Sequence, residues 1–226
     1  VINSEKRLLG IVTRGTIMTI SSSKSPIKVK GIMTSPKYLS EIEEDAYQTI
    51  KRMIKMDEWY SPVVNSATEK ILLGVIGLEN FIDYIIRHSP EKLAPPVSEI
   101  MTTNVLTCSP EDEVDNVWRL MQERNFAGLP VTFKDKLVGI ITQKDLLENG
   151  FAMPTFESAK GRFRSPVKVS AIMQTQVIAV TPNVRAIRVA RVMVSKDIGR
   201  VPVIDKNWKL LGMVDREDIA RLIVKG

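Results

Sequence analysis

The sequence contains very little cysteine and histidine, with one residue of each among 226. The lone cysteine, Cys108, has no partner for an internal disulfide, which is typical of proteins from a reducing cytoplasm. His88 and Cys108 together cannot supply the His/Cys ligand set of a zinc site, so we predict no metal site. No apolar run approaches the roughly 18 residues that a membrane-spanning helix needs. We therefore expect a cytoplasmic protein without membrane association.

Motifs of common enzyme classes are also absent. The sequence has no Gly-x-x-x-x-Gly-Lys-Ser/Thr phosphate loop, no Gly-x-Gly-x-x-Gly turn and no Gly-x-Ser-x-Gly nucleophile elbow. We therefore expect no enzymatic activity and no catalytic residues. The chain opens on Val1 rather than Met and lacks the pattern of a signal peptide, which indicates a fragment.

The composition favours a folded protein with anionic partners. Hydrophobic residues make up 44% of the chain, enough for a sizeable buried core. There are 32 Lys and Arg against 26 Asp and Glu, a net charge of +6. This excess favours nucleotides, nucleic acids or acidic protein surfaces, without choosing among them.

One pattern recurs along the chain with a nearly constant period. Ile-Met pairs end at Met33, Met101 and Met173, with spacings of 68 and 72 residues. Pro-Val pairs begin at Pro62, Pro130 and Pro202, with the same two spacings. The register is therefore kept through each repeat, which indicates an array of equivalent supersecondary units.

Each repeat reads as an extended segment, a helix, two strands and a second helix. The strands form a hairpin that returns through Gly74-Val75-Ile76, Gly139-Ile140-Ile141 or Gly212-Met213-Val214. Apolar residues at helical spacing include Val114, Val117, Leu120 and Met121, and also Ile187, Ala190 and Met193. These patterns predict an α+β fold in which each repeat has a small three-stranded sheet and two helices.

A single unit of about 60 to 70 residues would be marginally stable, so we expect the repeats to pair. The start of the chain, Leu9-Gly10-Ile11-Val12-Thr13, matches only the return strand of a hairpin, so the first repeat is incomplete. The predicted repeats are 1–20 (a tail), 26–88, 91–150 and 165–226. They form two modules, 1–90 and 91–226, joined by a proline-containing linker with Pro90, Pro95 and Pro96.

With the Ile-Met, Pro-Val and Gly-x-x-Thr-x-x-Asp landmarks in place, the sequence resembles the cystathionine-β-synthase (CBS) repeat family over essentially its whole length. Its layout is similar to that of archaeal four-CBS proteins and of the γ subunit of AMP-activated protein kinase. The resemblance implies two Bateman modules that bind AMP, ADP, ATP or S-adenosyl compounds between paired repeats. The ligand is then regulatory rather than a catalytic cofactor. A homodimer and a regulated enzyme or kinase are the implied protein partners.

The third repeat carries the family's Ser/Thr-x-x-Asp signature as Thr142 and Asp145. The resemblance implies that Asp145 accepts hydrogen bonds from ribose hydroxyls and that Thr142 lies near phosphate. An ionised carboxylate suits two adjacent hydroxyl donors. The same two residues also fit a helix capping box, which needs no ligand. Both interpretations remain open on the sequence alone.

The fourth repeat places Asp218 at the ribose position and Asp215 where the family has Ser or Thr. A carboxylate beside a phosphate is repulsive, and Arg200 is the residue that would compensate, either as a bidentate phosphate ligand or merely as an exposed cation. The first module has Thr16 and Asn80 at the ribose positions. We therefore predict that ligand binding is concentrated in the second module.

Further residues are implied by the family's pseudo-twofold arrangement. The predicted pocket walls are Phe126 and Ala127 opposite Asp218, and Ile198 and Gly199 opposite Asp145, with Thr103 and Thr175 as additional ligand contacts. Apolar positions beside a strand are also ordinary core positions. The walls are therefore predicted from the resemblance alone.

Two other functions remain open. A nucleic-acid-binding protein would use the basic loop 160–168, with Phe163 between cations, and the helical stripe Arg185, Arg188 and Arg191. A purely structural array would dimerise through its helical faces and bind no ligand.

Overall fold

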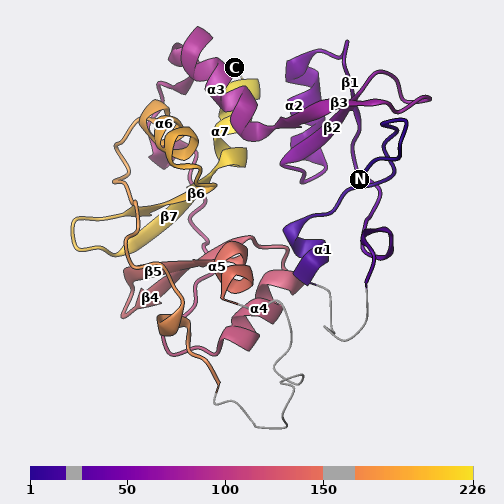
Figure 1. Ribbon diagram of the computed structural model, residues 1–226. Helices are drawn as coiled ribbons and strands as arrows, with labels where there is room; N and C mark the ends of the chain where they lie inside the picture. Colours follow the sequence, from indigo (N-terminus) through magenta and orange to yellow (C-terminus); the bar gives the residue numbers. More distant parts are fainter. Residues whose placement is uncertain (19–26, 150–165, 226) are drawn as a thin grey trace.

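Hairpins and helices alternate in the computed structural model, which describes residues 1–18, 27–149 and 166–225 (Figure 1). The antiparallel hairpins pair β2 (Tyr60–Val64) with β3 (Leu72–Gly77), β4 (Gly128–Phe133) with β5 (Lys136–Thr142), and β6 (Arg200–Ile204) with β7 (Leu210–Asp215). The predicted hairpins and the α+β class are therefore confirmed.

The proline of each Pro-Val pair is placed where it breaks no bond of its hairpin. Pro130 is paired with Ile140, whose N–H and C=O both bond outward to Gln174 rather than to Pro130. Pro202 is paired with Met213, whose groups bond to Thr102 in the same way. A missing N–H at such a position costs no hydrogen bond between the two strands.

The third strand of each small sheet is very short. In the second repeat it is β1 (Ser40–Glu41), parallel to β2. In the third and fourth repeats it is a single parallel bridge, Cys108 to Val131 and Val180 to Val203. A proline follows two residues after each of these bridges and cannot donate to a continued ladder.

Helices flank the hairpins in chain order. They are α1 (Arg14–Met18), α2 (Ala46–Lys55), α3 (Leu78–His88), α4 (Val114–Glu123), α5 (Gln143–Glu148), α6 (Ala186–Lys196) and α7 (Arg216–Lys225). Short 3₁₀ turns lie at η1 (Val29–Gly31), η2 (Pro90–Leu93), η3 (Val97–Glu99) and η5 (Val169–Ala171). The predicted stripe of α4 is buried at Val114, Val117 and Met121, as helical periodicity requires.

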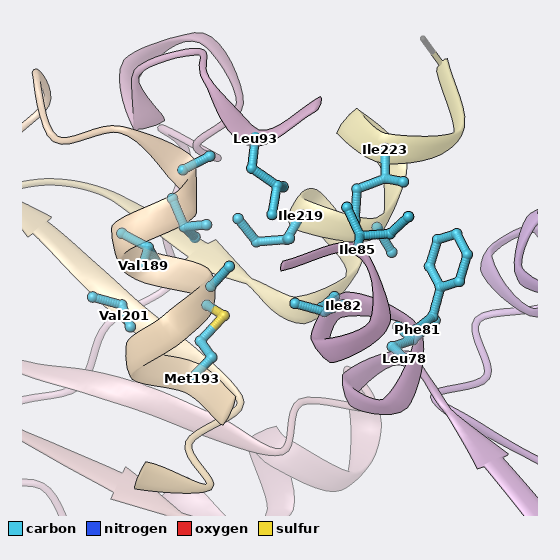
Figure 2. Close-up of a cluster of buried hydrophobic side chains, with 14 of the residues drawn as sticks. Leu78, Phe81, Ile82, Ile85, Leu93, Val189, Met193, Val201, Ile219 and Ile223 are labelled. Atoms are coloured by element: carbon cyan, nitrogen blue, oxygen red, sulfur yellow. The ribbon is translucent and has the colours of Figure 1, made fainter. Parts of the chain in front are cut away.

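The largest hydrophobic core is shared by the second and fourth repeats, which the sequence did not reveal. Side chains of α2 and α3 pack with those of α6 and α7 in one cluster of fully buried residues. Figure 2 shows Ile82 and Ile85 of α3 facing the same interior as Met193 of α6 and Ile219 of α7. The third repeat has a separate core around Val117, Leu129 and Leu146. Burial therefore connects the two predicted modules.

The proline-containing segment after α3 is packed, although we expected a linker there. Leu93 and Val97 are fully buried within the large core. The backbone is also tied down, because Ala186 donates to the Pro95 carbonyl and Val97 donates to the Val184 carbonyl. The prolines end α3, as predicted, but apolar residues between them anchor the segment to the fourth repeat.

The recurring Ile-Met segment docks on the hairpin of a neighbouring repeat. A Cβ atom at Gly212 would lie 2.8 Å from the Thr102 carbonyl oxygen and 2.9 Å from the Met101 Sδ. The reciprocal contact places Met173 Sδ at 2.7 Å from a Cβ at Gly139. The glycines of the third and fourth return strands, Gly139 and Gly212, thus leave room for the methionine of the partner repeat.

Substitution of Gly212 by alanine is expected to lower the free energy of unfolding by about 1–3 kcal/mol, because the new methyl group overlaps a backbone carbonyl. Gly74 is the matched control, since no neighbouring atom of the described residues lies within 4 Å of a Cβ there. Gly74→Ala is expected to change the free energy by less than about 0.5 kcal/mol. Urea denaturation measures both, and equal effects of the two changes would contradict the docking geometry.

Candidate functional site

Asp145 is buried at the start of α5, and both of its carboxylate oxygens accept hydrogen bonds. Oδ2 accepts hydrogen bonds from the Thr142 backbone N–H at 2.8 Å and from the Thr142 hydroxyl at 2.6 Å. Oδ1 accepts from Nε2 of Gln174 at 2.9 Å, and Gln174 belongs to the fourth repeat. The capping box proposed for Thr142 and Asp145 is therefore present. The Gln174 amide therefore takes up part of the acceptor capacity that a ribose would use.

Asp215 and Asp218 form an equivalent reciprocal pair at the start of α7. The Asp215 N–H donates to Asp218 Oδ2 at 2.9 Å, and the Asp218 N–H donates to Asp215 Oδ1 at 3.0 Å. Burial, followed by repulsion from the Asp215 carboxylate, raises the pKa of Asp218 from 3.8 to about 7. The Asp218 carboxyl group therefore gains or loses its proton near neutral pH.

The two carboxylates predicted to bind ribose differ in their free hydrogen-bonding capacity. Asp145 accepts at both oxygens, whereas in the described part of the chain Asp218 Oδ1 has no hydrogen-bond donor. Gln174 and Thr102 occupy equivalent places, because each exchanges two backbone hydrogen bonds with a residue of a return strand. The difference arises because only Gln174 has a side-chain amide that reaches a carboxylate. Asp218 is the more available acceptor.

Arg200 opens β6 and is a partly buried cation. Its guanidinium carbon lies 5.6 Å from the ring centroid of Trp59, within cation–π range. Burial lowers its pKa, Asp215 acts in the opposite direction, and Arg216 lowers it further. Among the residues that the structure describes, the Arg200 guanidinium has no hydrogen bond and no ion pair, although its backbone pairs with Asp215 in the β6–β7 ladder. It is not the freely exposed cation that one interpretation of the sequence allowed.

Arg216 is a functional candidate that the sequence reasoning missed. Its side chain is only 5% exposed and pairs with Glu79 at 3.3 Å and with Asp197 at 2.9 Å. It also donates to the hydroxyl of Tyr60 at 3.2 Å. The available signal was the repeat alignment, which puts this arginine at the position of the buried Leu78 in the second repeat. A charge at a core position requires a partner, and here the partners are carboxylates at the edge of the core.

The predicted wall residues lie near their own repeat's helix. The Phe126 carbonyl accepts from the Gln143 side chain, the Ala127 carbonyl accepts from the Gln143 N–H, and the Gly199 carbonyl accepts from the Arg216 N–H. Phe126 remains 40% exposed and Ile198 is partly buried. Their contact with a ligand stays a prediction.

The two predicted threonines differ in their surroundings. Thr175 is exposed and directly follows Gln174, the residue whose side chain bonds Asp145. Thr103 is exposed in a cleft of about 340 Å³ that also includes Asp135 and Lys209. Thr102 pairs with Met213 and Gln174 pairs with Ile140, both in antiparallel fashion, so the residues that follow them, Thr103 and Thr175, each run toward the start of the return strand. The geometry does not distinguish the two threonines, and contact of either one with a ligand stays a prediction.

The basic features are only partly placed. Arg185, Arg188 and Arg191 are exposed at the start and along the outer face of α6. Most of the basic loop 160–168, including Arg162, Phe163 and Arg164, lies outside the described residues. The nucleic-acid interpretation therefore gains no support from a defined surface.

Metal binding and membrane insertion find no candidate within the described ranges. No group of three or more His, Cys, Asp and Glu residues there has metal-binding geometry. Burial raises the pKa of the Cys108 thiol to about 12, and His88 stacks on Tyr84 with ring centroids 4.2 Å apart. None of the helices described in the structure is long and apolar enough to cross a bilayer.

Comparison with known proteins agrees with the repeat pattern. The model of the CBS domain matches residues 97–151 and 169–225. Protein MJ1225 of Methanocaldococcus jannaschii is 27% identical over 194 residues, covering 80% of this chain and 68% of that protein. The CBS domain-containing protein YhcV of Bacillus subtilis is 32% identical over 124 residues, covering 55% of this chain and 82% of YhcV. A match to inosine-5'-monophosphate dehydrogenase of Korarchaeum cryptofilum spans only 22% of that enzyme.

Solved structures show the same fold. The crystal structure of MJ1225, a protein proposed as an archaeal homologue of the γ subunit of AMP-activated protein kinase, superposes with a TM-score of 0.84 at 24% identity. It covers 97% of this chain and 85% of MJ1225. A conserved protein from Pyrococcus horikoshii gives a TM-score of 0.70 at 22% identity, covering 98% of this chain and 88% of that chain. The resemblance stated from the sequence is confirmed, and the chain belongs to the CBS-domain family.

Proposed function

We propose that this chain is a non-catalytic regulatory sensor that binds an adenosine-containing ligand beside Asp218 in its second module. The observation that carries the proposal is an available carboxylate and a cation at neighbouring element starts, since Arg200 opens β6 opposite Asp215, three residues before Asp218. Among the residues that the structure describes, Asp218 Oδ1 accepts no hydrogen bond and the Arg200 guanidinium forms no ion pair within 4 Å, although the charge of Asp215 acts on it. A ribose diol suits the carboxylate, and a phosphate suits the guanidinium.

The local charge balance favours a ligand with few negative charges. Arg200 interacts electrostatically with Asp215, and Arg216 is already paired with two carboxylates. One guanidinium facing one nearby carboxylate is better matched to a monophosphate than to a triphosphate. We therefore expect AMP to bind more tightly than ATP at this site.

Regulation would follow from where the site lies. Asp215 and Asp218 begin α7, whose apolar face packs into the core shared by the second and fourth repeats. A ligand that binds one packing of these repeats better than another shifts the equilibrium toward it. A homodimer partner, or a regulated enzyme or kinase, would respond to that shift.

Isothermal titration with adenosine, AMP, ATP, S-adenosylmethionine and methylthioadenosine tests the proposal. Asp218→Asn is expected to weaken binding of adenosine about 10- to 100-fold, because hydrogen bonds to an ionised carboxylate are lost. Asn at 218 still offers an oxygen to the Asp215 N–H, so the helix cap is kept. Asp145→Asn is the matched control, expected to change the affinity less than about threefold because Asp145 is already bonded to Gln174. Absence of binding by every adenosyl compound would refute the proposal.

A further inference from the structure

Trp59 belongs to the second repeat but lies against the fourth. It immediately precedes β2, and its carbonyl accepts a hydrogen bond from the Leu78 N–H at 3.0 Å. A Cβ atom at Gly199 would lie 2.8 Å from Cζ3 of the Trp59 ring. The indole therefore fills the space beside Gly199, at the point where the fourth repeat enters β6.

The same ring supports Arg200. The guanidinium carbon lies 5.6 Å from the indole centroid, so the cation rests over the face of the ring. On another side, Nη1 of Arg200 lies 2.7 Å from where a Cβ at Gly128 would be. An aromatic face from the second repeat and a missing side chain in the third repeat together define the position of this guanidinium.

The segment that carries Trp59 is itself fixed to the second module. The adjacent Tyr60 accepts a hydrogen bond from Arg216, and Glu79 forms an ion pair with the same guanidinium. Arg216 lies between Asp215 and Asp218 in the sequence. The first module thus contacts both Arg200, which is paired with Asp215 across the hairpin, and Arg216, which lies between Asp215 and Asp218.

The following inference rests on the proposed function, in which a ligand binds beside Asp218. We infer that Trp59 is a positioning residue by which the first module holds Arg200 in place to receive the anionic group of a ligand bound beside Asp218. The second module's site is then incomplete without the first. Trp59 determines the preference for a phosphorylated ligand and leaves recognition of the nucleoside to Asp218.

A purely space-filling role for Trp59 makes a different prediction. Loss of packing would disturb the site as a whole and would weaken the binding of adenosine and of AMP by similar factors. Loss of positioning would weaken only the ligand that carries a phosphate. The ratio of the two affinities therefore separates the two roles.

Isothermal titration of Trp59→Leu with adenosine and with AMP provides the test. AMP affinity is expected to fall about threefold to tenfold, the range of a partly desolvated cation–π contact, while adenosine affinity stays within about twofold. Trp59→Tyr is expected to restore most of the AMP affinity because it keeps an aromatic face. Trp208→Leu is the matched control, since Trp208 is 51% exposed and remote in the fold at the β6–β7 turn.

A double-mutant cycle completes the experiment. In an Arg200→Gln background, Trp59→Leu is expected to have no further effect on the AMP to adenosine ratio, because the two residues act through one contact. An unchanged ratio in Trp59→Leu, or equal losses for both ligands, would overturn the positioning role while leaving the proposed function intact. Failure of the unmodified protein to bind either ligand would instead overturn the proposed function.

Discussion

Replacement of Ile82 by alanine is expected to lower the free energy of unfolding by about 2–5 kcal/mol, through lost apolar burial and the cavity left behind. Ile82 is fully buried on α3, within the core that α3 shares with α6 and α7. Figure 2 shows its side chain directed into that shared interior. Urea denaturation followed by circular dichroism measures the change.

The same experiment examines whether the two modules unfold together. Because one core contains residues from both, Ile82→Ala is expected to shift a single cooperative transition. Leu73→Ala is the control: Leu73 is 54% exposed on β3, and its loss is expected to cost less than about 0.5 kcal/mol. Two separate transitions, with only one moved by Ile82→Ala, would show that the shared core does not couple the modules.

Adenosine is expected to bind about tenfold more weakly for each pH unit below 7, because the proposed site needs an ionised Asp218. Burial and the Asp215 carboxylate raise the pKa of Asp218 to about 7, so the acceptor form is lost as the pH falls through that value. Above pH 7 the affinity should level off. Titration calorimetry at pH 5, 6, 7 and 8 measures the profile.

Adenosine is chosen because it has no phosphate that would titrate in the same range. Asp218→Asn removes the titrating group, so its weaker affinity is expected to be flat with pH. A flat profile in the unmodified protein would show that an ionised Asp218 is not needed for binding. AMP serves as a comparison, since its phosphate adds a second titration near pH 6.

The raised pKa of Asp218 also makes the free energy of unfolding depend on pH. Between about pH 4 and 7 the folded protein retains a proton on Asp218 that the unfolded chain has released. The unfolded state binds fewer protons there, so the contribution of this group to the free energy of unfolding falls as the pH rises. Above pH 7 both states are ionised, and the contribution no longer changes.

The local features of the repeats could be predicted from sequence because each depends on short-range rules. Hairpins followed from the Pro-Val and glycine landmarks, and the cap at Thr142 and Asp145 followed from their three-residue spacing. The shortness of the third strand was not predicted: Cys108 and Val180 each form one bridge before a proline. The linker around Pro95 was misjudged because prolines end helices whether or not the residues between them are buried.

The sequence predicted which residues belong to the candidate site but not the contacts that these residues make. Repeat alignment singled out Asp145, Asp218 and Arg200, and it distinguished the two half-sites only by the Asp215 carboxylate that replaces Ser or Thr. The difference in hydrogen bonding between Asp145 and Asp218 comes from Gln174, which bonds Asp145 across 29 positions of sequence. The alignment also placed Trp59 level with Gly199, yet nothing in one sequence indicates that a tryptophan from another repeat supports Arg200.

By itself, the sequence determined the repeat architecture, the α+β class and the family, because a pattern repeated three times specifies the same local structure each time. Only the tertiary structure decided which repeats share a core and which charges meet. Arg216 contacts Glu79 and Tyr60 across 137 and 156 positions of sequence. Such contacts depend on how whole repeats pack, and packing of distant helices leaves no periodic trace in the chain.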